Sequence, residues 1–166
     1  RQGDPISPNT FIILLERVLD KIREEEKGVE ISGTRINNLC FADDIDLLEY
    51  DMQSLENAAR ALNAEGERYG LTMNFEKTKI LVFGEKNSTD NLVIDGNQLE
   101  KVEKFTYLGS NMTYDLDCKK EVLVRIAKAT TTLKAMDKIW KSKAIKTETK
   151  KRVMQTCIFS GMMYGC

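Results

Sequence analysis

The sequence predicts an α+β fold over about the first 110 residues, followed by an all-α region. Three observations support this prediction. Two segments with apolar residues at helical spacing flank a pair of short apolar runs of strand type, and further strand-like runs follow. From residue 118 to the end of the 166-residue chain the apolar spacing is helical. The charge also differs between the two parts of the chain. Residues 1–100 are acidic, with 11 Lys/Arg and 20 Asp/Glu, whereas residues 101–166 are basic, with 14 Lys/Arg and 6 Asp/Glu.

Composition excludes several classes of function. The chain is 42% hydrophobic and 31% charged, as in globular proteins, and its apolar runs are too short to span a membrane. It contains no His, which excludes Ser/His and Cys/His catalysis and most zinc sites. Its four cysteines are far apart, so we expect reduced thiols. The chain begins with Arg1 instead of Met, and we expect a fragment of a longer protein.

Residues 8 to about 25 are predicted to form an amphipathic helix. Ser7 can cap it and Pro8 suits its first position, while Ile6 and Phe11 can form a hydrophobic staple. Gly28 is the stop signal. The expected buried face consists of Phe11, Leu14, Leu15, Val18, Leu19 and Ile22.

A β-hairpin is predicted over residues 36–50, with two adjacent carboxylates at its tip. Apolar runs flank Asp43 and Asp44, and an Asp pair after the small Ala42 suits a tight turn. Two neighbouring anions repel each other, and a hard divalent cation such as Mg²⁺ relieves that repulsion. A solvated acidic turn without a ligand is the alternative.

A second helix is predicted over residues 52–69, with Gly70 as its stop, and Asp95-Gly96 is a hairpin-turn signal. The other expected strands are residues 29–32, 71–75, 79–83 and 105–108.

Residues 111–117 are predicted to be a polar linker, and residues 118–166 a basic helical region. The expected helical face comprises Val122, Ile126, Ala129, Leu133, Met136 and Trp140, and Thr147 is expected to cap the last helix. Most of the excess positive charge of residues 101–166 lies between residues 119 and 152, which suits binding to phosphates. A solvated lysine-rich helix face explains the same charge equally well.

Several blocks, in this order, resemble the reverse transcriptase of non-LTR (LINE-type) retrotransposons. Residues 1–8, RQGDPISP, look like the RQGDPLSP block of that family, and residues 41–44, FADD, look like its F/YADD catalytic hairpin. The GLTMNFEKTK of residues 70–79 is similar to GLxxNxxKTK, and residues 107–109 match the YLG block. The end of the chain, MYGC, resembles a segment that continues as YGxExW.

The resemblance implies a right-hand polymerase. Residues 1–110 would be part of its palm, an antiparallel sheet with helices on one face, and residues 118–166 its helical thumb. Such enzymes copy an RNA template onto a DNA primer from deoxynucleoside triphosphates, with two Mg²⁺ (or Mn²⁺) held by three aspartates. Asp43 would be the principal metal ligand and Asp44 the auxiliary one.

The resemblance also assigns roles in substrate and nucleic-acid binding to other residues. Lys77 would contact phosphates and protonate the leaving group, although an ordinary strand-edge lysine is the alternative. Gln2 and Gly3 would lie by the nucleotide and template, or else form an ordinary helix-entry loop. Phe41 and Ala42 would also lie by the nucleotide and template. The primer grip would be formed by Tyr107, Leu108 and Gly109. The residues that contact the nucleic-acid backbone would be Lys119, Lys120, Arg125, Lys128 and Lys134.

One departure from the family pattern is decisive. The block with the first aspartate and the fingers segment should precede Arg1, and we expect the missing N-terminal part of the parent protein to supply them. We therefore expect this chain alone to be an inactive piece of a nucleotidyltransferase. A non-catalytic nucleic-acid-binding remnant is the second hypothesis, and a group II intron-type enzyme is a third, to which the RQGDP opening is less similar. We expect an intracellular protein, and a nuclear location would suit its parent.

Overall fold

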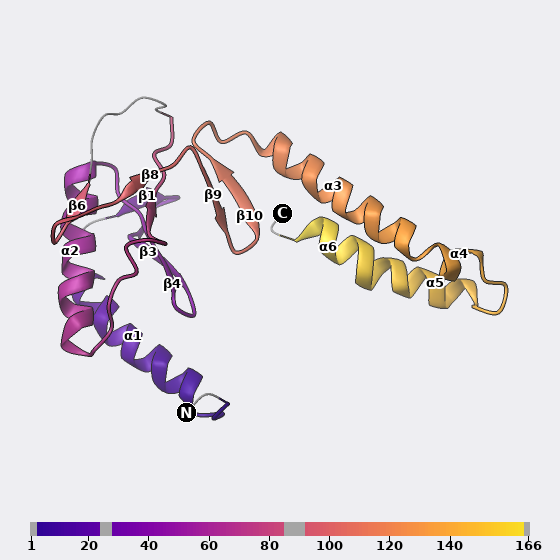
Figure 1. The fold of residues 1–166 in the computed structure, drawn as a ribbon, viewed down its shortest axis with the longest axis horizontal. Helices are drawn as coiled ribbons and strands as arrows, with labels where there is room; N and C mark the ends of the chain where they lie inside the picture. The colour runs from indigo at the N-terminus through magenta and orange to yellow at the C-terminus, as the bar shows by residue number, and fades with distance from the viewer. Residues whose placement is uncertain (1–2, 24–27, 85–91, 165–166) are drawn as a thin grey trace. The chain divides into compact units, whose positions relative to one another are not determined.

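The computed structural model describes residues 3–23, 28–84 and 92–164. The chain divides into two compact units, the first made of Arg1–Ile80 with Ser88–Lys101 and the second of Leu81–Asn87 with Val102–Cys166. Both are shown in Figure 1.

The first unit contains two helices and eight short strands in its described part. The helices are α1 (Ser7–Arg23) and α2 (Met52–Arg68). The strands are β1 (Val29–Ile31), β2 (Thr34–Ile36), β3 (Asn38–Phe41), β4 (Asp44–Leu47), β5 (Lys79–Ile80), β6 (Val93–Ile94), β7 (Asn97–Gln98) and β8 (Glu100–Lys101).

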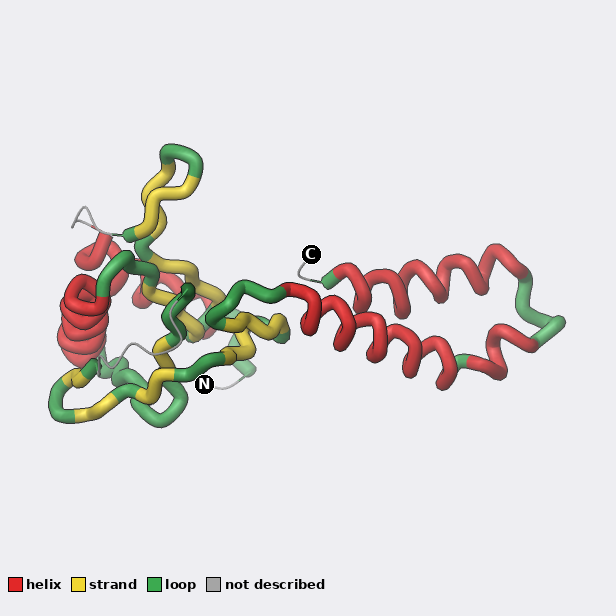
Figure 2. The backbone as a smooth tube through the Cα atoms, turned by 90° about the horizontal axis from the view of Figure 1, so that it is seen from above, coloured by secondary structure: helices red, strands yellow, loops and turns green. Residues whose placement is uncertain are grey.

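The described helices and strands of the second unit are a β-hairpin followed by helices. Its described elements are β9 (Lys104–Tyr107), β10 (Ser110–Thr113), α3 (Cys118–Ala135), α4 (Asp137–Lys141), α5 (Thr147–Val153), the π-helical segment η1 (Met154–Phe159) and α6 (Ser160–Met163). In Figure 2 the run of α3 and α4 lies beside the run of α5, η1 and α6, and α3 packs on η1 and α6. None of the helices in the described ranges has both the length and the apolar character that a membrane span requires.

The predicted α+β class is confirmed, but in the described residues the expected antiparallel sheet is present only as separate two-stranded pairs. Their strands pair only two by two. Four pairs are antiparallel hairpins, β1–β2, β3–β4, β6–β7 and β9–β10, whereas β5 and β8 run parallel. Strands of two to four residues offer too few ladder hydrogen bonds to build a wide sheet by themselves.

The core of the first unit lies where α1 and α2 pack on each other and on β4. Leu15, Leu19, Ile22 and Ala58 form a buried cluster, as the helical spacing of α1 predicts. The partly buried side chains packed against it are Phe11, Ile45, Leu47, Leu62 and Leu71. Helix, hairpin and helix therefore share one apolar core.

Both ends of α2 are closed by specific contacts. At its start the Asp51 carboxylate accepts a hydrogen bond of 2.8 Å from the Ser54 N–H, a typical N-cap that lowers the pKa of Asp51. At its end the predicted stop, Gly70, has φ of 76° and donates its N–H to the Glu67 carbonyl over 3.0 Å. Glycine reaches this left-handed conformation without a steric penalty.

Two predicted strands are wrong or shortened. Residues 71–75 form no strand, because Asn74 organises a turn in which its Oδ1 accepts a 3.1 Å hydrogen bond from the Lys77 N–H. The Asn74 carbonyl also accepts from the Thr78 hydroxyl over 2.8 Å. Asn side chains compete with strand pairing in this way. The predicted strand 79–83 is reduced to β5.

The C-terminal region also differs from expectation in three places. The predicted linker 111–117 includes most of β10, which pairs with β9. The prediction that Thr147 caps the last helix is wrong, because Thr147 is the first residue of α5. The N-cap residue of α5 is Lys146, whose side chain makes no capping hydrogen bond. On the predicted apolar face of α3, Val122 and Ile126 are about half exposed, whereas the nearby Arg125 is buried. Ion pairing with Glu121 explains how the charge of Arg125 is accommodated in a buried position.

The core makes a stability prediction. Leu19→Ala should lower the free energy of unfolding by about 2–5 kcal/mol, because Leu19 is fully buried and its truncation leaves a cavity. Ile13→Ala on the exposed side of α1 is the matched control, with an expected loss below about 0.5 kcal/mol. Urea unfolding followed by circular dichroism measures both. Equal losses would show that α1 does not pack through the Leu19 face.

Candidate functional site

The β3–β4 hairpin carries the acidic pair at its tip, as the sequence predicts. Phe41 and Asp44 form the last cross-strand pair, so Ala42 and Asp43 are the two residues of the turn. Ala42 has φ of 54°, a left-handed conformation that is uncommon for a residue with a Cβ. Such strain persists only where the surrounding structure imposes it, and it is common at functional sites.

Strand alternation places Asp44 on the side of the hairpin away from the helices. Ile45 and Leu47 pack on the core of α1 and α2, and successive side chains of a strand point to opposite faces. Asp44 and Asp46 therefore share the other face with Phe41, whose side chain is 62% exposed. The turn places Asp43 next to this face.

The acidic pair fits part of a divalent-cation site. Asp43 and Asp44 are both exposed and offer the hard oxygen ligands that Mg²⁺ and Mn²⁺ accept. Within the described ranges, no group of three or more His, Cys, Asp or Glu side chains is arranged to hold a metal ion. The hairpin thus supplies two adjacent carboxylates to a candidate cation site.

The other predicted site residues of the first unit lie in loops. Gly3 is exposed in the turn before α1, with φ of 91°, and Gln2 lies outside the described residues. Lys77 is exposed in the turn that Asn74 organises before β5. Phe41 and Ala42 belong to the acidic hairpin itself.

The predicted primer-grip residues form the turn between β9 and β10. Tyr107 and Ser110 are the closing pair, and Leu108 and Gly109 are the two turn residues. Both have positive φ, 46° and 81°, which is the pattern of a type I′ hairpin turn. The sequence predicts the strand that leads into Gly109 but not the returning strand β10.

The basic residues predicted to contact nucleic acid do not all face solvent. Lys119, Lys120, Lys128 and Lys134 are exposed along α3 and remain available for phosphate contacts. Arg125 is different, because its guanidinium is buried and bonded within the protein, with Nε 2.7 Å from a Glu121 oxygen. The candidate phosphate-binding set is therefore the four lysines.

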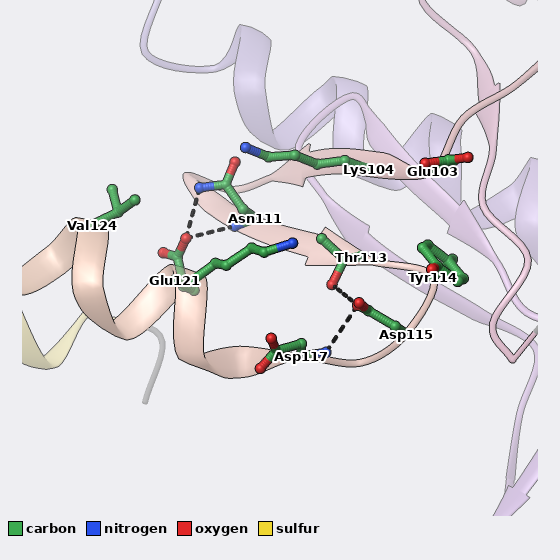
Figure 3. Close-up of a pocket in the computed structure, with 10 residues that line it drawn as sticks. Glu103, Lys104, Asn111, Thr113, Tyr114, Asp115, Asp117, Glu121 and Val124 are labelled. Carbon is green, nitrogen blue, oxygen red and sulfur yellow. Dashed lines mark hydrogen bonds between the residues drawn. The ribbon is translucent and has the colours of Figure 1, made fainter. Parts of the chain in front are cut away.

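A cavity of about 170 Å³ lies at the start of α3, and Figure 3 shows Asp115 turned toward Thr113 and Glu121 turned toward Asn111. Asp115 accepts a hydrogen bond of 2.6 Å from the Thr113 hydroxyl, which lowers the pKa of Asp115. Glu121 accepts one of 2.6 Å from the Asn111 side-chain amide, and this contact lowers the pKa of Glu121. Glu121 thereby joins α3 to β10, whereas Asp115 holds the loop before α3 against Thr113. The i, i+4 spacing of Glu121 and Arg125 indicates their pairing in the sequence, but not the contact with β10.

An acidic β-hairpin and a lysine-rich helical unit are features suited to a protein that handles nucleic acid with divalent cations. Residues 1–112, about two thirds of the chain, match the family described as reverse transcriptase (RNA-dependent DNA polymerase). The chain belongs to the reverse transcriptase family. Enzymes of this family use divalent metal ions, an RNA template, a primer and deoxynucleoside triphosphates.

Two relatives refine this assignment. Both are described as a retrovirus-related Pol polyprotein from type-1 retrotransposable element R2. The one from Popillia japonica is 31% identical over 119 residues, and the one from Nasonia vitripennis is 28% identical over 120 residues. Each alignment covers 66% of this chain, but only 20% and 12% of the respective relatives. The resemblance to non-LTR retrotransposon reverse transcriptases is confirmed.

The Glu121 contacts predict a pH dependence of stability. The Asn111 amide lowers the pKa of Glu121 below its ordinary value of 4.5, so the ionised group stabilises the fold above that pH. This contribution is lost as the pH falls through the lowered pKa. Glu121→Gln should therefore lower the urea midpoint at neutral pH, and its difference from the wild type should shrink between about pH 5 and pH 3.

The matched control is Glu148→Gln at the exposed start of α5, where the paired Lys151 is 3.7 Å away and both side chains are solvated. We expect no resolvable midpoint change there at either pH. A Glu121→Gln difference that stays constant with pH would contradict an ionised role for Glu121.

Proposed function

We propose that this chain is the palm and thumb part of an RNA-directed DNA polymerase of a non-LTR retrotransposon. The observation that carries the proposal is the FADD hairpin, whose register puts Asp44 on the exposed face and Asp43 in the adjoining turn. Family membership over residues 1–112 supports it. The first unit would then belong to the palm, and the helices of the second unit to the thumb.

The chemistry assigned to the hairpin is nucleotidyl transfer. Bound Mg²⁺ or Mn²⁺ would lower the pKa of the primer 3′-hydroxyl and offset the charge on the departing pyrophosphate. Asp43 is the principal ligand in this proposal and Asp44 the auxiliary one. The third carboxylate would come from a segment of the parent protein that precedes this chain.

Other residues would bind and orient the substrates. Gln2, Gly3, Phe41 and Ala42 would border the nucleotide and template, and the turn of residues 107–109 would hold the primer strand. Lys77 would contact the phosphates of the incoming nucleotide and hold a proton for the leaving group. The exposed lysines of α3 would neutralise backbone phosphates of the template–primer duplex.

A non-catalytic nucleic-acid-binding role is the second candidate. The exposed lysines of α3 favour it, as does the lack of a three-carboxylate metal group among the described residues. Binding that weakens steeply with salt and is unaffected by Mg²⁺ would support it, because counterion release requires no chemistry. Metal-dependent synthesis would decide for the polymerase.

Primer extension on an RNA template tests the catalytic proposal. The chain alone should give no product with Mg²⁺ or Mn²⁺, because the hairpin supplies only two carboxylates. Fusion to the preceding reverse transcriptase segment of the Popillia japonica relative should give synthesis. Asp43→Asn in the fusion should reduce the rate at least about 100-fold, because a metal ligand is lost.

Asp20→Asn on the exposed side of α1 is the matched control for that fusion, and we expect its rate to be unchanged. Efficient synthesis by the 166-residue chain alone would contradict the two-carboxylate account. Undiminished synthesis by the Asp43→Asn fusion would contradict the assignment of Asp43.

A further inference from the structure

The turn between β9 and β10 has an unusual backbone. Leu108 has φ of 46° and Gly109 has φ of 81°, so a bulky side chain occupies the left-handed region. Glycine adopts this conformation freely, but for a residue such as leucine it is an outlier that neighbouring contacts must maintain. Contacts around the turn must therefore hold Leu108 in this conformation.

Two side chains from distant parts of the second unit hold the carbonyl groups of this turn. The Tyr164 hydroxyl donates a hydrogen bond of 2.8 Å to the Leu108 carbonyl. Arg125 Nη2 donates to the Gly109 carbonyl over 3.4 Å and to the Ser110 hydroxyl over 2.9 Å. Both residues of the turn are thus held through their backbone oxygens.

Arg125 and Tyr164 also hold each other. The guanidinium carbon lies 5.2 Å from the centroid of the Tyr164 ring, within the range of a cation–π contact. Arg125 Nε is bonded to Glu121, and the other Glu121 oxygen accepts hydrogen bonds from the Asn111 backbone and side chain. The cluster joins β10, α3 and the residue after α6.

This cluster fixes the orientation of the peptide groups in the turn. Because a peptide bond is planar and trans, the Gly109 N–H points away from the Leu108 carbonyl and hence away from the Tyr164 hydroxyl. Because Gly109 is exposed, this N–H can donate to an anion such as a phosphate oxygen. Loss of the Tyr164 hydroxyl would let this peptide plane rotate without removing any charge.

We propose that Arg125 and Tyr164 are positioning residues that hold the Tyr107–Leu108–Gly109 turn in the shape that receives the 3′ end of a primer strand. This inference rests on the proposed function, because it takes the turn to be the primer contact. It changes the role of Arg125 from the phosphate ligand predicted by the sequence to an internal support. It gives Tyr164, beyond the matched family region, a part in substrate placement.

Tyr164→Phe tests the inference, because it keeps the ring beside Arg125 and removes only the hydroxyl. Affinity is measured by fluorescence anisotropy for two RNA–DNA hybrids of equal length, one with a recessed primer 3′ end and one continuous. We expect the wild type to prefer the recessed end. Tyr164→Phe should reduce this preference by roughly two- to ten-fold, the effect of one hydrogen bond, while affinity for the continuous hybrid stays within about two-fold.

Tyr50→Phe is the matched control. Its hydroxyl accepts a hydrogen bond of 3.0 Å from the Glu30 N–H in the first unit, so the variant also removes one hydroxyl that an exposed tyrosine bonds to the backbone. We expect its end preference to equal that of the wild type. A merely structural effect of losing a tyrosine hydroxyl would appear in both variants.

Arg125→Lys is the second variant, because it retains the charge but loses the planar fork of the guanidinium. It should reduce the end preference in the same direction as Tyr164→Phe. Its matched control is Arg60→Lys in α2, where the guanidinium likewise bonds the glutamate four residues earlier, Glu56, and a carbonyl, that of Val93. No change in end preference is expected for Arg60→Lys.

Each outcome bears on a distinct claim. An unchanged end preference in both Tyr164→Phe and Arg125→Lys overturns the positioning role, and so does a wild type that binds both hybrids equally. In either case salt-dependent binding of the hybrids would leave the proposed function intact. A wild type that binds neither hybrid contradicts the proposed function itself.

Discussion

The alternation of β4 between a buried and an exposed face is the constraint on which the acidic site depends. Ile45 and Leu47 must face the core of α1 and α2, because leaving them in water would forfeit the main stabilising contacts of the hairpin. A slip of one residue would exchange the faces and bury Asp44 without a partner. The apolar core therefore determines where the carboxylates lie, and the same burial that stabilises the unit exposes its candidate metal ligands.

In the second unit, the main constraint is the set of contacts that holds the Leu108–Gly109 turn beside the basic helix α3. Arg125 and Glu121 form an ion pair in which both side chains are largely buried, 10% and 15% exposed. Pairs of this kind specify geometry more than they add stability, because their desolvation offsets much of the attraction. Here the paired Arg125 contacts Ser110 and the Tyr164 ring, and Tyr164 in turn bonds the Leu108 carbonyl of the turn. The exposed lysines of the same helix remain free of this structural role.

Much of the fold could be predicted because local signals agree with packing. The apolar spacing of α1, the Gly70 stop and the Asp95-Gly96 turn each follow from the local sequence. Local sequence signals gave the wrong result at Asn74. The alternating residues 71–75 predict a strand, but the Asn74 side chain bonds the Lys77 N–H and forms a turn. The acidic pair could be located, but not the Arg125–Tyr164 cluster, because its members are 39 positions apart and Arg125 resembles the lysines around it.

The central claim, that the hairpin tip is a divalent-cation site, is most directly tested by paramagnetic broadening of amide signals by Mn²⁺. Titration into the isotopically labelled chain should first broaden the amides of residues 42–46, Mg²⁺ should reverse the effect, and Asp43→Asn should abolish it. Broadening centred instead on Asp115, Asp117 and Glu121 at the start of α3, or spread evenly over the exposed acids, would contradict the account.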